Sequence, residues 1–153
     1  MKNFLDTIAQ ETHLPKMAKI RQSFERPQIP DVRQEVLNQL NLPEITRTLR
    51  PGSRIAITAG SRGIANIALV LKTVVSFVKQ AGCTPFLFPA MGSHGGVMPQ
   101  GQREILESFG ITPDTVDAPI HCDVQVQELC RLDDGTPVCI DKFAAQADGT
   151  PTA

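Results

Sequence analysis

The feature that most constrains the fold is a repeated order of apolar segment, glycine-containing loop and helix-like segment. Residues 53–58 and 84–88 have the length and composition of buried strands. A broad apolar stripe over 64–81 follows the first of them, and a helix-like segment over 99–109 follows the second. Because strand–helix alternation with short connections aligns successive strands in parallel, the pattern predicts an α/β fold.

Two later segments extend this prediction. Residues 124–129 alternate apolar and polar side chains, and 137–141 follow a turn-forming Asp-Asp-Gly-Thr sequence, so both are expected to be strands. Residues 144–149 have the character of an approach to another strand, yet 150–153 supply none. We therefore expect a mostly parallel twisted sheet with helices on both faces, Rossmann-like in plan and incomplete at the C-terminus.

The first 50 residues differ in character from the rest. Residues 1–30 contain three prolines among scattered apolar side chains, which favours an arm that wraps a larger body or contacts a partner. Residues 31–40 form a short amphipathic pattern with Asp31 as N-cap, ended by Pro43. The expected organisation is an arm and short helix over 1–50 and an α/β domain over 51–153.

Composition narrows the classes of function. A formal net charge of −1 argues against nucleic-acid binding, which needs a basic excess on one face. The N-terminus lacks the apolar stretch of a signal peptide, and no segment is long enough to span a membrane. The four cysteines match neither a redox pair nor a zinc site, and they predict reduced thiols in a cytoplasmic protein: Cys83, Cys122, Cys130 and Cys139.

The loop after the first strand is a candidate anion site. Gly60 and Gly63 free the backbone, Ser61 offers a hydroxyl, and Arg62 offers a guanidinium at the start of a helix. A helix amino end and an arginine together suit a carboxylate or phosphate. The alternative is a simple glycine turn with a surface arginine, because the spacing matches neither a phosphate loop nor a dinucleotide turn.

The loop after the second strand contains His94 within Met91-Gly-Ser-His-Gly-Gly96. An imidazole there is either a loop histidine bonded to backbone or an acid–base group, since histidine is suited to proton transfer near neutral pH. Both loops leave the carboxyl ends of consecutive strands, so we expect His94 and Arg62 at the same sheet edge. His121, next to Cys122 and Asp123, is expected to be structural rather than a metal ligand.

In their order, these residues resemble the nickel-dependent lactate racemase family of α-hydroxyacid racemases and epimerases. The similarity starts at Ile55-Ala-Ile-Thr-Ala-Gly-Ser-Arg62 and continues through Pro85-Phe-Leu-Phe-Pro-Ala-Met-Gly-Ser-His-Gly-Gly96. It runs on through the Gly101-Gln pair and through Gly135-Thr-Pro-Val138 to Ala147-Asp148, which covers the chain from about residue 50 onward.

The resemblance implies roles for particular residues. Arg62 would bind the substrate carboxylate, and His94 would be one of two acid–base residues. Ser61, whose hydroxyl lies next to Arg62 in the loop, is expected to contact the substrate as well. Hydride would leave the α-carbon of an α-hydroxy acid for a nickel-pincer nucleotide and return to the other face. Ala59 stands where the racemase type has an aspartate, which changes the support of the arginine.

The residues that hold the pincer and the nickel belong, in that family, to segments after the Ala147-Asp148 match. The resemblance therefore implies an N-terminal domain without its C-terminal domain, inactive alone, with no cofactor or metal site in this chain. A non-catalytic module that binds a small carboxylate or phosphate is the alternative. A third interpretation is an interaction fragment whose sheet is completed by a partner, either a second copy or the missing domain.

Overall fold

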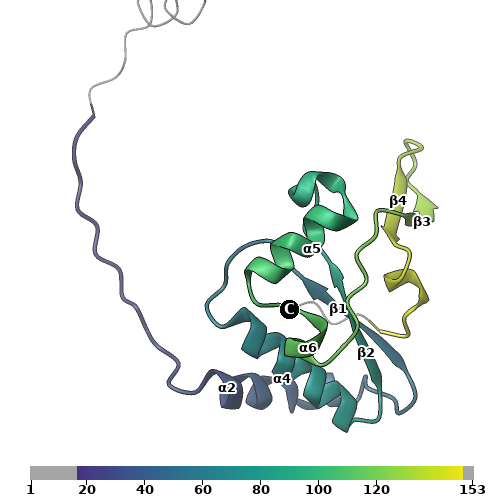
Figure 1. Cartoon of the computed structure of the whole chain (residues 1–153), viewed down its shortest axis with the longest axis horizontal. Helices are drawn as coiled ribbons and strands as arrows, with labels where there is room; N and C mark the ends of the chain where they lie inside the picture. Colours follow the sequence, from purple (N-terminus) through teal and green to yellow (C-terminus); the bar gives the residue numbers. More distant parts are fainter. Residues whose placement is uncertain (1–16, 150–153) are drawn as a thin grey trace, which may run out of the picture.

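The computed structural model describes residues 17–149 (Figure 1). Residues 17–30 form an extended arm that runs away from the body, and the helices and strands follow from residue 32 onward. They are α2 (Val32–Leu40), α3 (Pro43–Thr46), β1 (Arg54–Ala59), α4 (Ile67–Gln80), β2 (Thr84–Pro89), η1 (His94–Val97), α5 (Pro99–Ser108), α6 (Pro113–Val116), β3 (Val126–Arg131), β4 (Pro137–Asp141) and η2 (Ala144–Gln146).

The centre of the molecule is a small parallel sheet. β1 and β2 pair in parallel along their whole length, from Arg54 opposite Thr84 to Ala59 opposite Pro89. Single parallel bridges extend the sheet on both sides, Gly149 beside β1 and Ile120 beside β2. The expected approach of 144–149 to another strand is thus confirmed, because Gly149 adds to the free edge of β1. The α/β class is confirmed as well.

A proline within β2 fits because of the direction in which its backbone nitrogen points. Leu87, two residues later, donates its N–H away from β1, to the carbonyl oxygen of Pro119 at 2.8 Å. Pro85 lies on the same side of the strand, where it lacks an N–H to donate. It precedes the single bridge to Ile120, so no ladder hydrogen bond is lost.

Successive side chains of β1 and β2 point to opposite faces of the sheet, so the core has two parts. Ile57 and Leu87 point to one face, where α4, α5 and α6 cover them with Leu71, Leu106 and Val116, all at most 1% exposed. Phe86 and Phe88 point to the opposite face. We expected α-helices on both faces, but in the described chain they cover only the first. Ala144 of η2 and Ile140 of β4 pack on the second face instead. Two phenylalanines fill that space, so a short 3₁₀ turn suffices to cover it.

Some element boundaries differ from the sequence prediction. The helix expected from residue 64 begins at Ile67, because Asn66 has a left-handed backbone with φ of 62° that no helix interior adopts. The strand expected at 124–129 is shifted to Val126–Arg131. Pro43, expected only to end the preceding helix, also opens α3, since proline fits the first turn of a helix. Between residues 17 and 149, no helix combines the length and apolarity that a bilayer crossing requires.

Candidate functional site

The two candidate loops meet at the carboxyl edge of the parallel sheet. Residues 60–66 join β1 to α4, and residues 90–93 join β2 to η1. The loops are tied together where they leave the strands, since the Ala90 N–H donates to the carbonyl oxygen of Ala59 at 2.9 Å. Met91, 6% exposed, anchors the second loop in the core. The predicted meeting of the two loops at one sheet edge is therefore what the structure shows.

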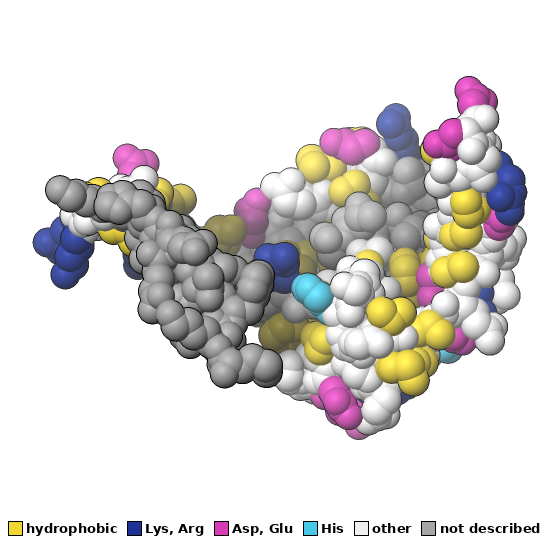
Figure 2. Space-filling view, turned by 90° about the horizontal axis from the view of Figure 1, so that it is seen from above, with side chains coloured by type: hydrophobic (Ala, Val, Ile, Leu, Met, Phe, Trp, Pro, Cys, Tyr) yellow, Lys and Arg dark blue, Asp and Glu magenta, His cyan; other side chains and the backbone are white. Residues whose placement is uncertain are grey.

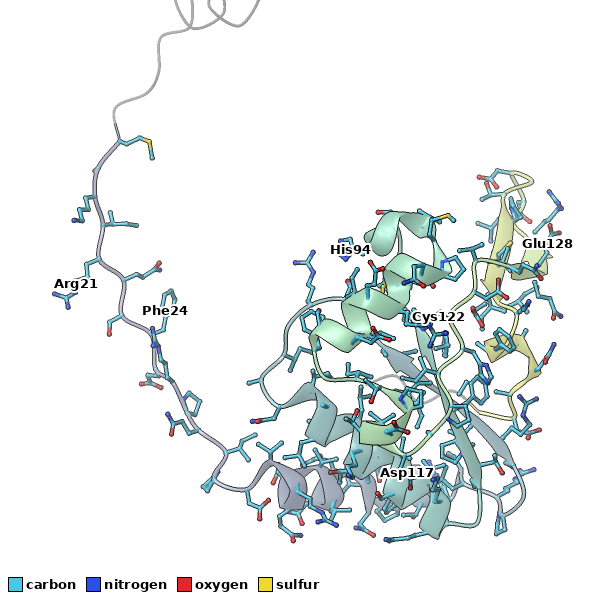
Figure 3. The ribbon with its side chains drawn as sticks, viewed as in Figure 1. Arg21, Phe24, His94, Asp117, Cys122 and Glu128 are labelled. Atoms are coloured by element: carbon cyan, nitrogen blue, oxygen red, sulfur yellow. The ribbon has the colours of Figure 1, made fainter. Side chains whose placement is uncertain are left out.

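Ser61 and His94 form the central contact of this site. The Ser61 hydroxyl is hydrogen-bonded to Nδ1 of His94, while the His94 backbone N–H donates to the carbonyl oxygen of Met91. His94 lies at the exposed top of the molecule (Figure 3). With Nδ1 engaged by Ser61, Nε2 is the ring nitrogen left to meet a ligand. Sequence reasoning assigned Ser61 to the substrate, whereas the structure places it against the histidine.

Arg62 stands beside this pair without a partner. Its side chain is exposed, and none of the residues from 17 to 149 forms an ion pair or hydrogen bond with it. The neighbouring α4 starts at Asn66 without a side-chain cap, so the amino end of a 14-residue helix adds positive potential nearby. A free guanidinium and an uncapped helix end on one loop suit a small anion. From above, a histidine and a basic side chain are seen close together on the surface (Figure 2).

A close approach of two glycines holds the His94 loop in place. Gly95 has a φ of 72°, and its backbone packs directly on the first turns of α5. A Cβ on Gly95 would lie 2.6 Å from the Gln102 backbone nitrogen, and one on Gly101 would lie 2.8 Å from the Gly95 carbonyl carbon. Both distances are shorter than any normal contact, so only glycine fits at either position. The His94 loop therefore packs on α5 through direct contact between the two backbones.

The sequence offered no derivation of this support. The Gly101-Gln102 pair stood out only as part of a resemblance, and nothing in a single sequence says that two glycines touch. Gln102 is 7% exposed, and its Oε1 accepts no hydrogen bond within the described chain. A glutamine in a helix ordinarily points to solvent, so its burial beside the loop could not be read from the pattern.

His121 lies on the other face of the sheet, away from Arg62 and His94. Its ring stacks on Phe143 with centroids 4.4 Å apart and meets the Phe86 edge at 5.3 Å. Burial lowers the pKa of His121, nearby Arg54 lowers it further, and Asp141 opposes the change. The histidine therefore acts as an aromatic core residue held neutral, as the structural interpretation expected.

This environment predicts a dependence of stability on pH. The pKa of His121 is lowered from its ordinary 6.5 on folding, so the unfolded state binds more protons as the pH falls. The free energy of unfolding is expected to decrease on acidification through about pH 6.5 in the wild type. In His121→Phe, which keeps the stacking, this decrease should be smaller. Urea unfolding at pH 7.5 and 5.5 measures it.

Two aspartates with lowered pKa values titrate below the pH range of that comparison. Hydrogen bonds from Lys79 and from Lys142 lower the pKa of Asp117 and of Asp123 below 3.8, outside the measured range. An equal loss of stability on acidification in wild type and His121→Phe would contradict the assignment to His121.

The described residues do not fit a nickel cofactor. Between residues 17 and 149, no three His, Cys, Asp or Glu side chains converge on a point where a metal ion could bind. All four cysteines are free thiols, and burial raises the pKa of the Cys122 thiol, which disfavours the thiolate that a metal would need.

A second arginine-lined hollow lies at the opposite end of β1. It measures about 450 Å³ and contains Arg47 and Arg50 beside Ser53. The Asp148 carboxylate also lines it and accepts a hydrogen bond from the Arg54 N–H at 2.8 Å. That carboxylate would repel an anion, whereas no described carboxylate contacts Arg62. The loop site is thus the better anion site of the two.

Comparison of the chain with protein-family models, with curated proteins and with solved structures finds no match. The arrangement of Ser61, Arg62 and His94 at the sheet edge therefore carries the functional argument.

Proposed function

We propose that this chain is the N-terminal domain of a lactate racemase-like enzyme, and that it binds a small α-hydroxy acid at the carboxyl edge of its sheet. Its finer architecture would be that of a Rossmann-like sheet, of which β1, β2 and the two bridging segments form the core. The observation that carries the proposal is the Ser61–His94 hydrogen bond beside the unpartnered Arg62. Four unpaired thiols suit a reducing compartment, and we place the protein in the cytoplasm.

Each residue of the site has a separate task in this proposal. Arg62 binds the substrate carboxylate, because a guanidinium presents two parallel N–H groups to the two carboxylate oxygens. Ser61 Oγ accepts a hydrogen bond from Nδ1–H of His94, and this tautomer leaves the Nε2 lone pair facing the ligand. That nitrogen then accepts a hydrogen bond, and finally the proton, from the α-hydroxyl group.

The chain supplies binding and proton transfer, which is one half of the proposed chemistry. In the resembled family, a nickel-pincer nucleotide takes up the α-hydride when it is bound. The described residues do not fit that group, so the role proposed for this chain ends with the carboxylate and the hydroxyl.

A non-catalytic carboxylate- or phosphate-binding module is the second candidate. The exposure of the site favours this module. Arg62 and His94 are both exposed, so water and salt screen their charges.

Esterase-like chemistry by Ser61 has less support. Its activation would require a carboxylate that orients the histidine, and within residues 17–149 the only side chain bonded to the ring is Ser61.

The α-hydroxyl group of the ligand discriminates between the two candidates. L-Lactate is expected to bind about threefold to tenfold more tightly than propionate, which lacks only the hydroxyl, since one hydrogen bond contributes about 0.5–1.5 kcal/mol. His94→Ala should remove this difference while leaving propionate binding unchanged. Amide chemical shifts followed during titration give both affinities and report which loops respond.

A matched control is His121→Ala, which removes a histidine from the far face and should leave the preference for lactate intact. Equal affinity for lactate and propionate in the wild type would reject the α-hydroxy acid and favour the simple anion module. Binding of inorganic phosphate in preference to both would favour the same module.

A further inference from the structure

The β3–β4 hairpin presents apolar side chains that the rest of the described chain leaves uncovered. All six residues of β3 are exposed, and β3 pairs with β4 along one edge only. Val126 is 62% exposed and Leu129 is 57% exposed, with Val124 and Leu132 close behind. A two-stranded hairpin gains little stability in water by itself, so a covering partner would stabilise it.

The arm over residues 17–30 has a matching character. It is extended, and its large apolar side chains are among the most exposed of the described residues: Met17 at 95%, Ile20 at 80%, Phe24 at 66% and Ile29 at 58%. Side chains of an extended segment alternate between two sides. Figure 3 shows Arg21 and Phe24 on opposite sides of the arm, and the alternation places Ile20 and Phe24 together on one side.

The charges of the two segments are complementary. The arm carries three basic side chains and one acidic, which gives residues 17–30 a formal charge of +2. Residues 124–141 carry four acidic side chains and one basic, a formal charge of −3. Acidic side chains are visible at the hairpin end of the molecule (Figure 2). Opposite charge steers two surfaces together and fixes which surface meets which.

We propose that the arm of one copy packs along β3 of a second copy, and that the second arm does the same in return. The arm leaves the body beside α2, and the hairpin stands at the other end of the molecule in both views (Figures 1 and 2), which favours a second copy over the same chain. Reciprocal contacts double the buried area and close the assembly at two copies. The register of β3 shifts between Glu128 and Cys130, so the contact depends on side chains rather than on a continuous strand ladder.

Sedimentation equilibrium of the full chain tests the proposal. A dimer is expected, and Ile20→Asp combined with Phe24→Asp should raise its dissociation constant at least tenfold. Val126→Asp should do the same from the other side of the contact. Because all three residues are exposed, circular dichroism should show unchanged folding. Leu69→Asp, at an exposed apolar position on α4, is the control and should leave the dimer intact.

A disulfide experiment identifies the occupant. One chain carries Ser23→Cys on its arm with Cys130→Ser and Cys139→Ser on its hairpin, and it is mixed with a chain of different mass that keeps both hairpin cysteines. Cys122→Ser is present in both chains and Cys83 is buried, so a disulfide between the two chains joins an arm to the hairpin of another copy. The same background with Ser108→Cys, on α5, should not cross-link.

Three results would overturn the proposal. The wild type could remain monomeric at all concentrations, or the dimer could survive the arm and hairpin variants. Alternatively, Ser23→Cys in a chain with its own hairpin cysteines could form an intramolecular disulfide in a monomer, which would place the arm on its own hairpin.

Discussion

Replacing Arg62 with alanine is expected to weaken the binding of L-lactate to this chain about tenfold, which corresponds to about 1.4 kcal/mol. Hydrogen bonds to charged groups contribute about 1.5–3 kcal/mol, and the exposure of the site puts Arg62 at the low end of that range. Arg62→Lys should fall between wild type and Arg62→Ala, because lysine keeps the charge and loses the two parallel donors. Titration calorimetry measures all three affinities.

Arg47→Ala is the matched control for this prediction. It removes an exposed arginine from the hollow at the opposite end of β1 and should leave lactate binding unchanged. If Arg47→Ala weakened binding and Arg62→Ala did not, the anion site would lie in that hollow and the proposed site would be wrong. Loss of lactate binding with rising salt is expected in the wild type and should be weaker in Arg62→Ala.

Gly95→Ala is expected to destabilise the chain more than Gly96→Ala, by about 1–3 kcal/mol. Both glycines have a left-handed backbone, with φ of 72° and 65°, so the conformational cost of alanine is similar. They differ in space, because a Cβ on Gly95 would strike the backbone of α5, whereas a Cβ on Gly96 would have nothing within 4 Å. The difference between the two variants therefore isolates the contact with α5.

The same contact predicts a reversed sign for Gly101→Ala. Alanine in place of glycine within a helix ordinarily stabilises by about 0.5–1 kcal/mol. Here the added methyl group would strike Gly95, so we expect destabilisation and a displaced His94 loop. Urea unfolding gives the stabilities, and the lactate-to-propionate ratio reports whether His94 still faces the ligand. Equal unfolding free energies for Gly95→Ala and Gly96→Ala would contradict the close packing.

The sequence predicted the secondary structure near the site well, because periodicity and glycine loops are local signals. The strands before Gly60 and before Ala90 were placed within a residue of their positions, and the helix after residue 99 was nearly correct. The start of α4 was missed by three residues, because apolar Ile64 continues the helical stripe while Asn66 turns left-handed. Hydrophobic pattern alone cannot detect that turn.

The pattern of apolar residues and glycines did not predict contacts between segments that are distant in the sequence. The sequence indicated that the Arg62 and His94 loops share a sheet edge, since consecutive parallel strands end there. It did not indicate that the Ser61 hydroxyl is hydrogen-bonded to His94 rather than free to bind a ligand. The stacking of His121 on Phe143 was also unseen, because the two residues lie far apart along the chain.

What the sequence alone determined is the order of elements and the edge at which the candidate residues gather, since both follow from local periodicity and the parallel connection. Tertiary structure decided which side chains touch. How distant segments pack determines three features: the Ser61–His94 hydrogen bond, the close contact of Gly95 with α5, and the exposure of the hairpin. Packing is set by the shape of the whole core, and no single segment contains that information.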